Sequence, residues 1–409
     1  MSTLTNAPVE TAGEARVATV PWEAIAGLGT VLNAPLAAIL DGAAAERVLD
    51  KTLRANRELS AEQRRVVAES LFGVGLWRRR LRARHSANAS PLELLATLIR
   101  DLGQRSDASL LDVPQFSLKP LTDWRDRHSI PDWLATELER EFGADAAIAA
   151  AALNAPGPVC LRVNRLKLAR DGLAERLAAE GVATELGRWS PEALIITSPR
   201  PNLYGLSASR DALFEVQDEG SQLLGQWLQA QPGDRVLDLC AGAGGKALQL
   251  AAHVASNGRV HAFDIDPSRL NRLRHRAERA GATIDIHTQP PSGRFDRVLV
   301  DSPCSELGAL RRGPDLRWRI DPASFADHAL TGASLIDQGY ALLTSGGHLV
   351  YATCTFRREE NEDVVDAFLA RHPQARRVSD DFKVAPHTHG TDGFYAARIT
   401  SSSSGDPTA

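Results

Sequence analysis

The spacing of apolar residues changes along the chain and separates a helical part from parts that contain strands. Over residues 22–99 apolar positions recur every three to four residues, which predicts a series of amphipathic helices. Ser60 and Gln63 form a capping-box pattern that predicts the start of one of these helices. Residues 1–20 are small and polar without such a period, so we expect them to be disordered.

Beyond this block, shorter apolar segments alternate between helical and strand patterns. Residues 129–142 predict a helix, residues 160–164 a strand, and residues 171–180 and 193–197 a further helix and strand. These segments indicate a small α/β subdomain ahead of a larger α/β domain. The expected division of the chain is disorder at 1–20, a helical domain at 21–118, a linker helix and small α/β subdomain at 119–212, an α/β domain at 213–400 and a disordered tail at 401–409.

The last domain contains two apolar, β-branched runs that both lead to a cysteine. Residues 295–301 lead to Cys304, and residues 347–353 lead to Cys354. The carboxyl ends of parallel strands face the ligand crevice of such a sheet, and neighbouring strands lie about 4.8 Å apart. Both thiols can therefore overhang one pocket.

A glycine turn and an acidic residue follow two further predicted strands. The strand at 235–239 leads into a turn with Gly242 and Gly244, and the strand at 259–263 ends at Asp264. Glycines let a ligand approach the backbone, a helix amino terminus offers N–H groups, and an acid at the second strand's tip can hold a ribose diol. This order predicts a nucleoside-bearing cofactor. The turn lacks the complete GxGxxG pattern, and a tight turn that binds nothing is the alternative.

Composition and charge exclude several classes of protein. The chain has 409 residues, is 43% apolar and 24% charged, and carries a net charge of −4, which argues against nonspecific nucleic-acid binding. It has no run of about 18 apolar residues that would predict a membrane span. Residues 1–14 lack a secretory-signal pattern, so we expect a cytoplasmic protein. The four cysteines show neither a CxxC pair nor zinc-like spacing, which favours reduced thiols and no metal site.

Arginines gather in three segments, at residues 78–84, 269–279 and 311–319. Each segment is compatible with a solvated surface and with phosphate contact. In the third, Trp318 stands among arginines and offers a stacking face for an unpaired base, unless the segment is simply a surface loop.

These residues carry a resemblance to the Sun/RsmB-type RNA (cytosine-5) methyltransferases, which spans about residues 129–398. The helical block resembles, more weakly, the NusB-like domain that precedes the catalytic part in that family. The resemblance implies a Rossmann-like class I S-adenosylmethionine-dependent methyltransferase domain, preceded by a small α/β subdomain and an all-helical NusB-like RNA-binding domain. The matching segments are Leu161–Asn164, Gln217–Gln222, Asp238–Lys246, Asp301–Ser305, Thr353–Thr355, Glu359–Asn361 and Asp392–Tyr395.

The resemblance also implies which residues carry the chemistry. Methylation of carbon 5 of cytosine begins when a thiolate adds to carbon 6, and cysteine thiolates are strong nucleophiles. Cys354 would be the attacking thiol and Cys304 would assist release of the product. Asp301 would hydrogen-bond the cytosine edge, and Lys246 would contact the target base or its ribose. The S-adenosylmethionine site would be lined by Cys240, Ala241, Gly242, Ala243, Gly244, Gly245, Lys246, Asp264, Arg269 and Asp301.

The expected activity is S-adenosylmethionine-dependent methylation of carbon 5 of cytosine in RNA, by a monomer without a membrane partner. The helical domain favours small-subunit ribosomal RNA, and tRNA is the alternative substrate. The rival hypothesis is a non-catalytic RNA-binding or ribosome-assembly protein on the same scaffold, because two positions depart from the family. The acid that the family places near the adenine is absent around Thr288, with Asp285 three residues early. Glu306 replaces a small residue and is expected to raise the pKa of the neighbouring thiol.

Overall fold

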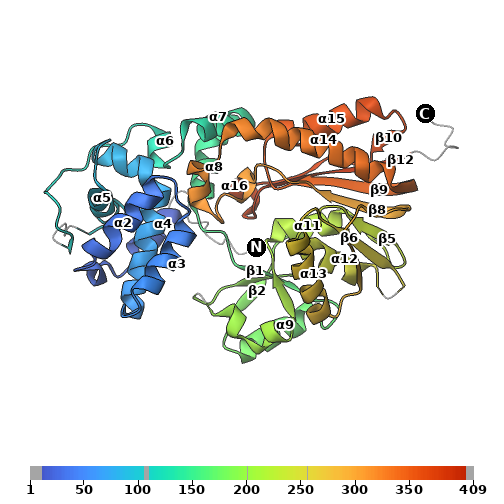
Figure 1. The fold of residues 1–409 in the computed structure, drawn as a ribbon, viewed down its shortest axis with the longest axis horizontal. Helices are drawn as coiled ribbons and strands as arrows, with labels where there is room; N and C mark the ends of the chain where they lie inside the picture. The colour runs from blue at the N-terminus through green and yellow to red at the C-terminus, as the bar shows by residue number, and fades with distance from the viewer. Residues whose placement is uncertain (1–11, 106–109, 200, 256, 402–409) are drawn as a thin grey trace, which may run out of the picture. The chain divides into compact units, whose positions relative to one another are not determined.

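Two folded units make up the chain in the computed structural model (Figure 1). The first unit holds residues up to Pro156 and also takes in the segment Leu310–Pro322. The second unit holds Gly157–Ala309 and the residues from Ala323 onward. Each unit has hydrophobic cores of its own. The structure describes residues 12–105, 110–199, 201–255 and 257–401.

The first unit is helical, as the apolar spacing predicts. Large apolar side chains such as Trp22, Leu71 and Trp77 form its core, each at most 2% exposed. The predicted capping box is confirmed, because Gln63 N donates to Ser60 Oγ and Ser60 N donates to Gln63 Oε1. The helices are α1 Ala12–Ala18, α2 Gly29–Leu40, α3 Ala45–Ala55, α4 Ala61–Arg84, α5 Pro91–Asp101, α6 Trp124–Arg127, α7 Asp132–Phe142 and α8 Ala146–Asn154.

The structure corrects the expected disorder of residues 1–20, because residues 12–18 form α1. Residues 1–11 lie outside the described residues. Arg16 donates twice to the carboxylate of Glu69 in α4, at 2.9 and 3.1 Å, and Val17 is buried in the helical core. A helix this short is unstable alone. Its order therefore depends on tertiary contacts that the local sequence does not reveal.

The segment Leu310–Pro322 is anchored in the first unit by buried polar side chains. Asp315 Oδ2 accepts from the backbone N–H of Ala45 at 3.1 Å. Arg317, fully buried, donates to Asn154 Oδ1 at 2.7 Å. Buried charges of this kind persist only where they are hydrogen-bonded, so these contacts fix the path of the segment.

The same segment contains Trp318, which the sequence offered as a stacking face for an unpaired base. The guanidinium of Arg78 lies over the Trp318 ring, 4.9 Å from its centre. One face of the ring is therefore covered by a cation from α4, and the prediction is wrong for that face. A cation over an aromatic face stabilises the packing of the segment on the helix.

The second unit begins with a four-stranded antiparallel sheet in the order β2-β3-β1-β4 and the helix that packs on it. Apolar residues such as Leu161, Leu173 and Leu194 join this sheet to the helix. The strand, helix and strand predicted between residues 160 and 197 are confirmed. The elements are β1 Cys160–Val163, α9 Arg170–Ala179, β2 Thr184–Leu186, β3 Ala193–Ile196, α10 Ser207–Arg210 and β4 Phe214–Val216.

A larger sheet follows in the order β10-β12-β9-β8-β5-β6-β7, with β11 paired to β12. Its strands are β5 Arg235–Asp238, β6 Arg259–Phe263, β7 Ile284–His287, β8 Phe295–Asp301, β9 Leu343–Thr353, β10 Ala375–Arg377, β11 Phe382–Val384 and β12 Phe394–Ser401. Its helices are α11 Glu219–Trp227, α12 Gly245–His253, α13 Pro267–Ala280, α14 Phe325–Ala341, α15 Glu362–Arg371 and α16 Pro386–His389.

Strands β9, β8, β5, β6 and β7 run parallel, and β12 runs antiparallel to β9. Helices α14 and α15 cover one face of the sheet, and α11, α12 and α13 cover the other (Figure 1). This three-layer arrangement confirms the predicted Rossmann-like fold. Of the expected tail, Ser401 belongs to β12 and residues 402–409 lie outside the described residues.

The register of β8 and β9 decides where the two cysteines lie. Asp301 at the end of β8 is paired with Ala352 of β9. Cys304 and Cys354 follow these residues closely, so both turns leave the same edge of the sheet. Within the described part of the chain, no helix is long and apolar enough to cross a membrane.

Candidate active site

The two cysteine turns bring their sulfur atoms together beyond the carboxyl ends of β8 and β9. Cys304 Sγ lies 3.4 Å from Cys354 Sγ, and the backbone N–H of Cys354 also donates to Cys304 Sγ at 3.4 Å. Both cysteines are free thiols, since a disulfide would need about 2.05 Å between the sulfurs. The predicted proximity of the two thiols is confirmed.

The surroundings of Cys354 favour its neutral form. The hydrogen bond with Cys304 and burial raise the pKa of the Cys354 thiol well above its ordinary value, and the charges of Asp301 and Glu306 act in the same direction. Glu306 therefore contributes to the raised pKa of Cys354, the thiol of the second turn. In the free protein Cys354 is therefore held as a thiol rather than a thiolate.

A buried carboxylate ties the two cysteine turns together. Glu360 is 1% exposed and accepts from the backbone N–H of Ser305 at 2.8 Å and from Ser305 Oγ at 2.7 Å. Ser305 Oγ is in turn 2.9 Å from Thr355 Oγ1. Because Ser305 follows Cys304 and Thr355 follows Cys354, this carboxylate fixes the backbone beside each thiol.

The neighbour of Glu360 supports the second turn alone. Asn361 Nδ2 donates to the carbonyl oxygen of Thr355 at 3.0 Å, and Thr353 Oγ1 donates to Asn361 Oδ1 at 2.5 Å. Sequence reasoning matched Glu359–Asn361 to a family segment without giving it a role. The available signal in the sequence was the pair of polar residues, Glu360 and Asn361, that follows shortly after Cys354.

Lys246 and Asp301 form an ion pair near the thiols. Lys246 Nζ lies 2.6 Å from Asp301 Oδ2. Burial lowers the pKa of the Lys246 ammonium, but the charge and hydrogen bond of Asp301 outweigh burial, and the charge of Asp238 adds to them, so the pKa is raised. Lys246 stays charged. The structure thus brings the four predicted catalytic residues into one electrostatic neighbourhood.

At the end of β5, Asp238 presents a carboxylate with unmet hydrogen-bonding capacity. It is 1% exposed, and neither oxygen has a well-formed partner among the described residues. Burial raises the pKa of Asp238 to about 7, with a further contribution from Asp301, while Lys246 and the Cys240 N–H act in the opposite direction. Sequence reasoning gave Asp238 no role, although an acid ending a buried strand was the signal. Burial also raises the pKa of the Cys240 thiol, which keeps it neutral.

The glycine turn has left-handed backbone at Gly242 and Gly244, with φ of 54° and 89°. A Cβ at Gly244 would lie 2.1 Å from Leu273 Cδ1, so this glycine permits close packing on α13. A Cβ at Gly242 would have no atom within 4 Å. The space beside Gly242 is therefore available to a ligand. The predicted residues Ala241, Ala243 and Gly245 complete the turn.

Asp264 ends β6 as predicted and also supports the glycine turn. Its carboxylate accepts from the backbone N–H of Gly242 and from that of Asp266, each at 2.8 Å. Arg269 lies at the edge of this group, with Nη1 3.9 Å from Asp264 Oδ2. Each carboxylate oxygen has a second lone pair, so Asp264 retains acceptor capacity for a ligand hydroxyl.

Arg162 was missing from the predicted site, yet it supports the glycine turn from β1. Its buried guanidinium donates to the carbonyl oxygen of Gly245 at 2.6 Å and also hydrogen-bonds Gln217 Oε1. Burial lowers the pKa of Arg162 to about 10. Arg276 of α13 donates to Ala243 O at 2.6 Å. A charged residue inside a four-residue buried strand was the sequence signal for Arg162.

Strand β7 lacks the acid that the family places near the adenine, as the sequence indicated. Asp285 lies within β7, where it pairs with Arg259 at 3.5 Å. The strand ends at His287, whose Nε2 is 3.0 Å from His261 Nδ1. A histidine pair rather than a carboxylate therefore stands at this end of β7.

These side chains fit S-adenosylmethionine, which carries two positive charges and a ribose diol. The unpartnered carboxylate of Asp238 suits a cation, Asp264 can accept from hydroxyls, and the open space at Gly242 admits a ligand to the backbone. Within the described residues, no group of three or more His, Cys, Asp or Glu side chains is placed to hold a metal ion.

Known families match two consecutive stretches of the chain. The family described as Methyltr_RsmF/B-like, ferredoxin-like domain matches residues 130–202. The family described as 16S rRNA methyltransferase RsmB/F matches residues 225–400. The resemblance stated from the sequence is thereby confirmed.

Individual proteins agree with these families. The probable ribosomal RNA small subunit methyltransferase B of Bacillus subtilis is 31% identical over 312 residues, which cover 69% of this chain and 69% of that protein. The corresponding protein of Synechocystis is 33% identical over 316 residues, covering 71% and 70%. The crystal structure of a methyltransferase homologue from Pyrococcus horikoshii shares the fold, with a TM-score of 0.60 at 24% identity, and covers 68% of this chain and 97% of its own. Because the chain is 31% and 33% identical to these two relatives over more than two thirds of their length, it belongs to the 16S rRNA methyltransferase RsmB/F family.

Proposed function

We propose that this protein transfers a methyl group from S-adenosylmethionine to carbon 5 of a cytosine in small-subunit ribosomal RNA. The observation that carries the proposal is the pair of thiols 3.4 Å apart at the ends of two adjacent parallel strands, beside the Lys246–Asp301 ion pair. Relatives named as ribosomal RNA small subunit methyltransferases support the choice of RNA.

In this proposal Cys354 adds to carbon 6 of the cytosine, and the new S–C bond makes carbon 5 nucleophilic. Asp301 accepts a hydrogen bond from the cytosine edge, and the charged Lys246 stabilises the electron density that moves into the ring. Because Cys354 is held as a thiol, its proton leaves as the sulfur adds, and cytosine N3, which receives the displaced electron pair, takes up a proton. S-adenosylmethionine, when bound, supplies an electrophilic methyl group. Cys304 then assists loss of the carbon 5 proton and departure of Cys354.

We propose further that the protein works as a monomer in the cytoplasm. The two thiols, Lys246 and Asp301 all come from one chain, so the chemistry requires no second copy. Light scattering of the purified protein with and without RNA tests the oligomeric state; a stable dimer would contradict the proposal.

A covalent-trapping gel tests the chemistry. Wild type, Cys304→Ala and Cys354→Ala are incubated with a radiolabelled methyl donor and unmethylated small-subunit rRNA. We expect label in the RNA with wild type, a slowly migrating protein–RNA adduct with Cys304→Ala, and neither with Cys354→Ala. An adduct with Cys354→Ala would reverse the two thiol roles.

A non-catalytic RNA-binding protein is the second candidate. One observation favours it: the pKa of Cys354 is raised, so little thiolate is present before a base binds. RNA binding by all three proteins, without label or adduct from any of them, would select this candidate.

A further inference from the structure

The carboxyl end of α13 is held against the small α/β subdomain by side chains that bond backbone carbonyl oxygens. Asn164 Nδ2 donates to Ala280 O at 2.9 Å. Lys167 Nζ donates to Arg279 O at 2.7 Å, and Arg279 Nη2 donates to Ser209 O at 2.7 Å. Both parts belong to the second unit. These bonds place α10, which contains Ser209, beside the end of α13.

Arginines follow one another along the side of α13 that meets this subdomain. Arg272, Arg276 and Arg279 are separated by four and three residues, so they lie on the same face of the helix. Arg276 is neutralised by Glu215, whose Oε2 lies 2.6 Å from Arg276 Nη2. Arg272 is exposed and, within the described parts of the chain, has no hydrogen bond or ion pair. Arg279 is also exposed, and its guanidinium bonds an uncharged carbonyl. Two of the three arginines therefore keep their positive charge available.

The small subdomain adds two further cations. Lys167 Nζ donates to Asp211 O at 2.6 Å, and Arg210 Nη1 donates to Gly205 O at 2.9 Å. Both side chains belong to exposed residues, and a carbonyl oxygen does not cancel their charge. The carboxylate of Asp211 is itself paired with Arg176 at 3.4 Å. The four cations, here called the α13 patch, are Lys167, Arg210, Arg272 and Arg279.

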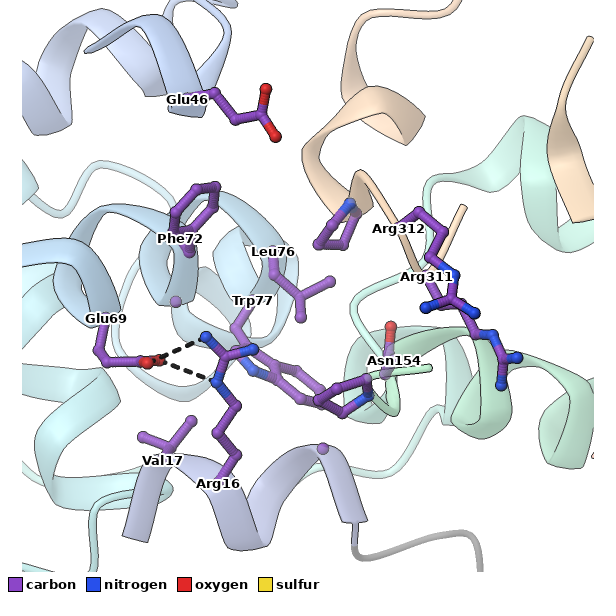
Figure 2. Close-up of a pocket in the computed structure, with 14 residues that line it drawn as sticks. Arg16, Val17, Glu46, Glu69, Phe72, Leu76, Trp77, Asn154, Arg311 and Arg312 are labelled. Atoms are coloured by element: carbon purple, nitrogen blue, oxygen red, sulfur yellow. Dashed lines mark hydrogen bonds and ion pairs between the residues drawn. The ribbon is translucent and has the colours of Figure 1, made fainter. Parts of the chain in front are cut away.

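Other arginines of the chain are paired with a carboxylate. Arg16 lines a pocket of about 200 Å³ in the first unit and donates twice to the carboxylate of Glu69, at 2.9 and 3.1 Å (Figure 2). A phosphate could bind Arg16 only at the expense of this ion pair. The cations of the α13 patch can bind a phosphate without breaking an ion pair, because among the described residues none of them meets a carboxylate.

An exposed aromatic ring lies next to the α13 patch. Tyr204 belongs to the short 3-10 turn Leu203–Gly205 and is 83% exposed. The turn is held at Gly205, whose carbonyl accepts from Arg210 and whose N–H donates to Asn202 Oδ1 at 3.3 Å. Within the described residues no other ring and no cation lies against Tyr204. Unlike Trp318, this side chain therefore offers an uncovered face on which a base can stack.

We propose that Tyr204 and the α13 patch bind an unpaired segment of the RNA substrate. A base stacks on Tyr204, and the neighbouring phosphates contact Arg210 and the arginines of α13. Arg272 and Arg279 lie about 10 Å apart along the helix, so a strand of a few nucleotides can reach both. Unpaired RNA is bound in this way elsewhere, by aromatic rings that take its bases and cations that follow its backbone. The inference rests on the proposed function, because it takes the ligand to be part of the RNA that is methylated.

The first test measures the affinity of the full-length protein for unmethylated small-subunit rRNA, without a methyl donor. Tyr204→Ala removes the stacking ring and is expected to weaken binding about fivefold or more. Tyr204→Phe keeps the ring and is expected to bind like wild type. Because Tyr204 is 83% exposed, neither change should affect folding, and urea unfolding checks this. Wild-type affinity of Tyr204→Ala would overturn the proposal.

The second test compares two charge reversals on α13 over a series of salt concentrations. Arg272→Glu is expected to weaken RNA binding and to reduce the slope of log affinity against log salt by about 1. Arg274→Glu is the matched control, because Arg274 is exposed but lies about 200° further round the helix. Its printed contact is a hydrogen bond to Asn271, at 2.7 Å on the same helix. Equal effects of the two variants would overturn the proposal, since only overall charge would matter.

Methyl transfer by the same proteins separates this inference from the proposed function. With the patch in use, Tyr204→Ala and Arg272→Glu should raise the KM for RNA and leave kcat nearly unchanged. Normal affinity and normal KM in both variants would overturn the patch and leave the proposed function intact. Weaker RNA binding by both variants, together with a wild type that transfers no methyl group, would support the patch and refute the proposed activity.

Discussion

Glu360 accepts two hydrogen bonds from Ser305, one from its backbone N–H at 2.8 Å and one from its hydroxyl at 2.7 Å. Through Ser305 and Thr355 the carboxylate links the turns that carry Cys304 and Cys354. The distance between the two sulfurs therefore depends on a residue that touches neither of them. This makes Glu360 a positioning residue.

Glu360→Gln replaces an acceptor oxygen by an amide that cannot accept both bonds from Ser305. Because a displacement of about 1 Å at reacting atoms can cost roughly a hundredfold in rate, we expect kcat to fall about ten- to hundredfold while the KM for RNA changes little. Steady-state methyl transfer measures both constants.

Glu359→Gln is the matched control, because it makes the same chemical change one residue earlier. Glu359 is partly exposed and pairs with Arg357. It is expected to retain most of the activity. Equal rates for the two variants would mean that the buried carboxylate does not position the thiols.

Glu306 acts on Cys354 through charge and on the fold through its backbone. It has φ of 58° and its charge raises the pKa of the Cys354 thiol. Glu306→Gln should lower that pKa, so that at pH 8 more thiolate is present and iodoacetamide labels Cys354 faster. Mass spectrometry of the Cys354 peptide across a pH series measures the change.

Glu306→Gly should lower the pKa as Glu306→Gln does and also relieve the left-handed backbone, adding about 1 kcal/mol to the free energy of unfolding. Urea unfolding of the two variants separates the effects. Labelling at the wild-type rate in both variants would show that Glu306 does not control the thiol.

Asp238 should release protons when S-adenosylmethionine binds. Its pKa is raised to about 7 by burial, and a bound cation favours the carboxylate and lowers that pKa. Binding at pH 7 should therefore release a fraction of a proton, and affinity should rise with pH as Asp238 ionises between about pH 6 and pH 8. Calorimetry in two buffers with different ionisation enthalpies measures the release.

In Asp238→Asn the side chain cannot titrate, so the binding enthalpy should no longer depend on the buffer through this group. If wild type and Asp238→Asn showed the same proton release, the carboxylate would not contact the cofactor's charges.

Gly308 lies where the first cysteine turn meets the segment before β12. Its N–H donates to Cys354 O and its carbonyl accepts from Gly393 N, each at 2.9 Å, and an added Cβ would lie 2.2 Å from Gly393 O. Gly308→Ala must separate these backbones, so we expect loss of methyl transfer and a free energy of unfolding lower by about 1–3 kcal/mol.

Gly313→Ala is the comparison variant, because a Cβ there has no atom within 4 Å and the backbone has negative φ. It should unfold at nearly the wild-type urea concentration. A Gly308→Ala protein as stable and active as Gly313→Ala would show that the two backbones can separate freely.

The sequence by itself determined the features that depend on neighbouring residues. Apolar spacing located the helices of the first unit, the Ser60–Gln63 pattern located a helix start, and β-branched runs located the strands that lead to Cys304 and Cys354. These predictions succeeded because side-chain periodicity and capping act within a few residues. The glycine turn and the position of Asp264 at the end of a strand were predicted for the same reason.

The tertiary structure alone decided which distant residues meet. Glu360 reaches Ser305 across 55 positions, Arg162 reaches the Gly245 carbonyl across 83, and Arg317 reaches Asn154 across 163. Residues 12–18 form a helix only because Arg16 and Val17 find partners far along the chain. Buried polar groups must be hydrogen-bonded, but local sequence does not say by which residue, because strand order and register bring the partner into place.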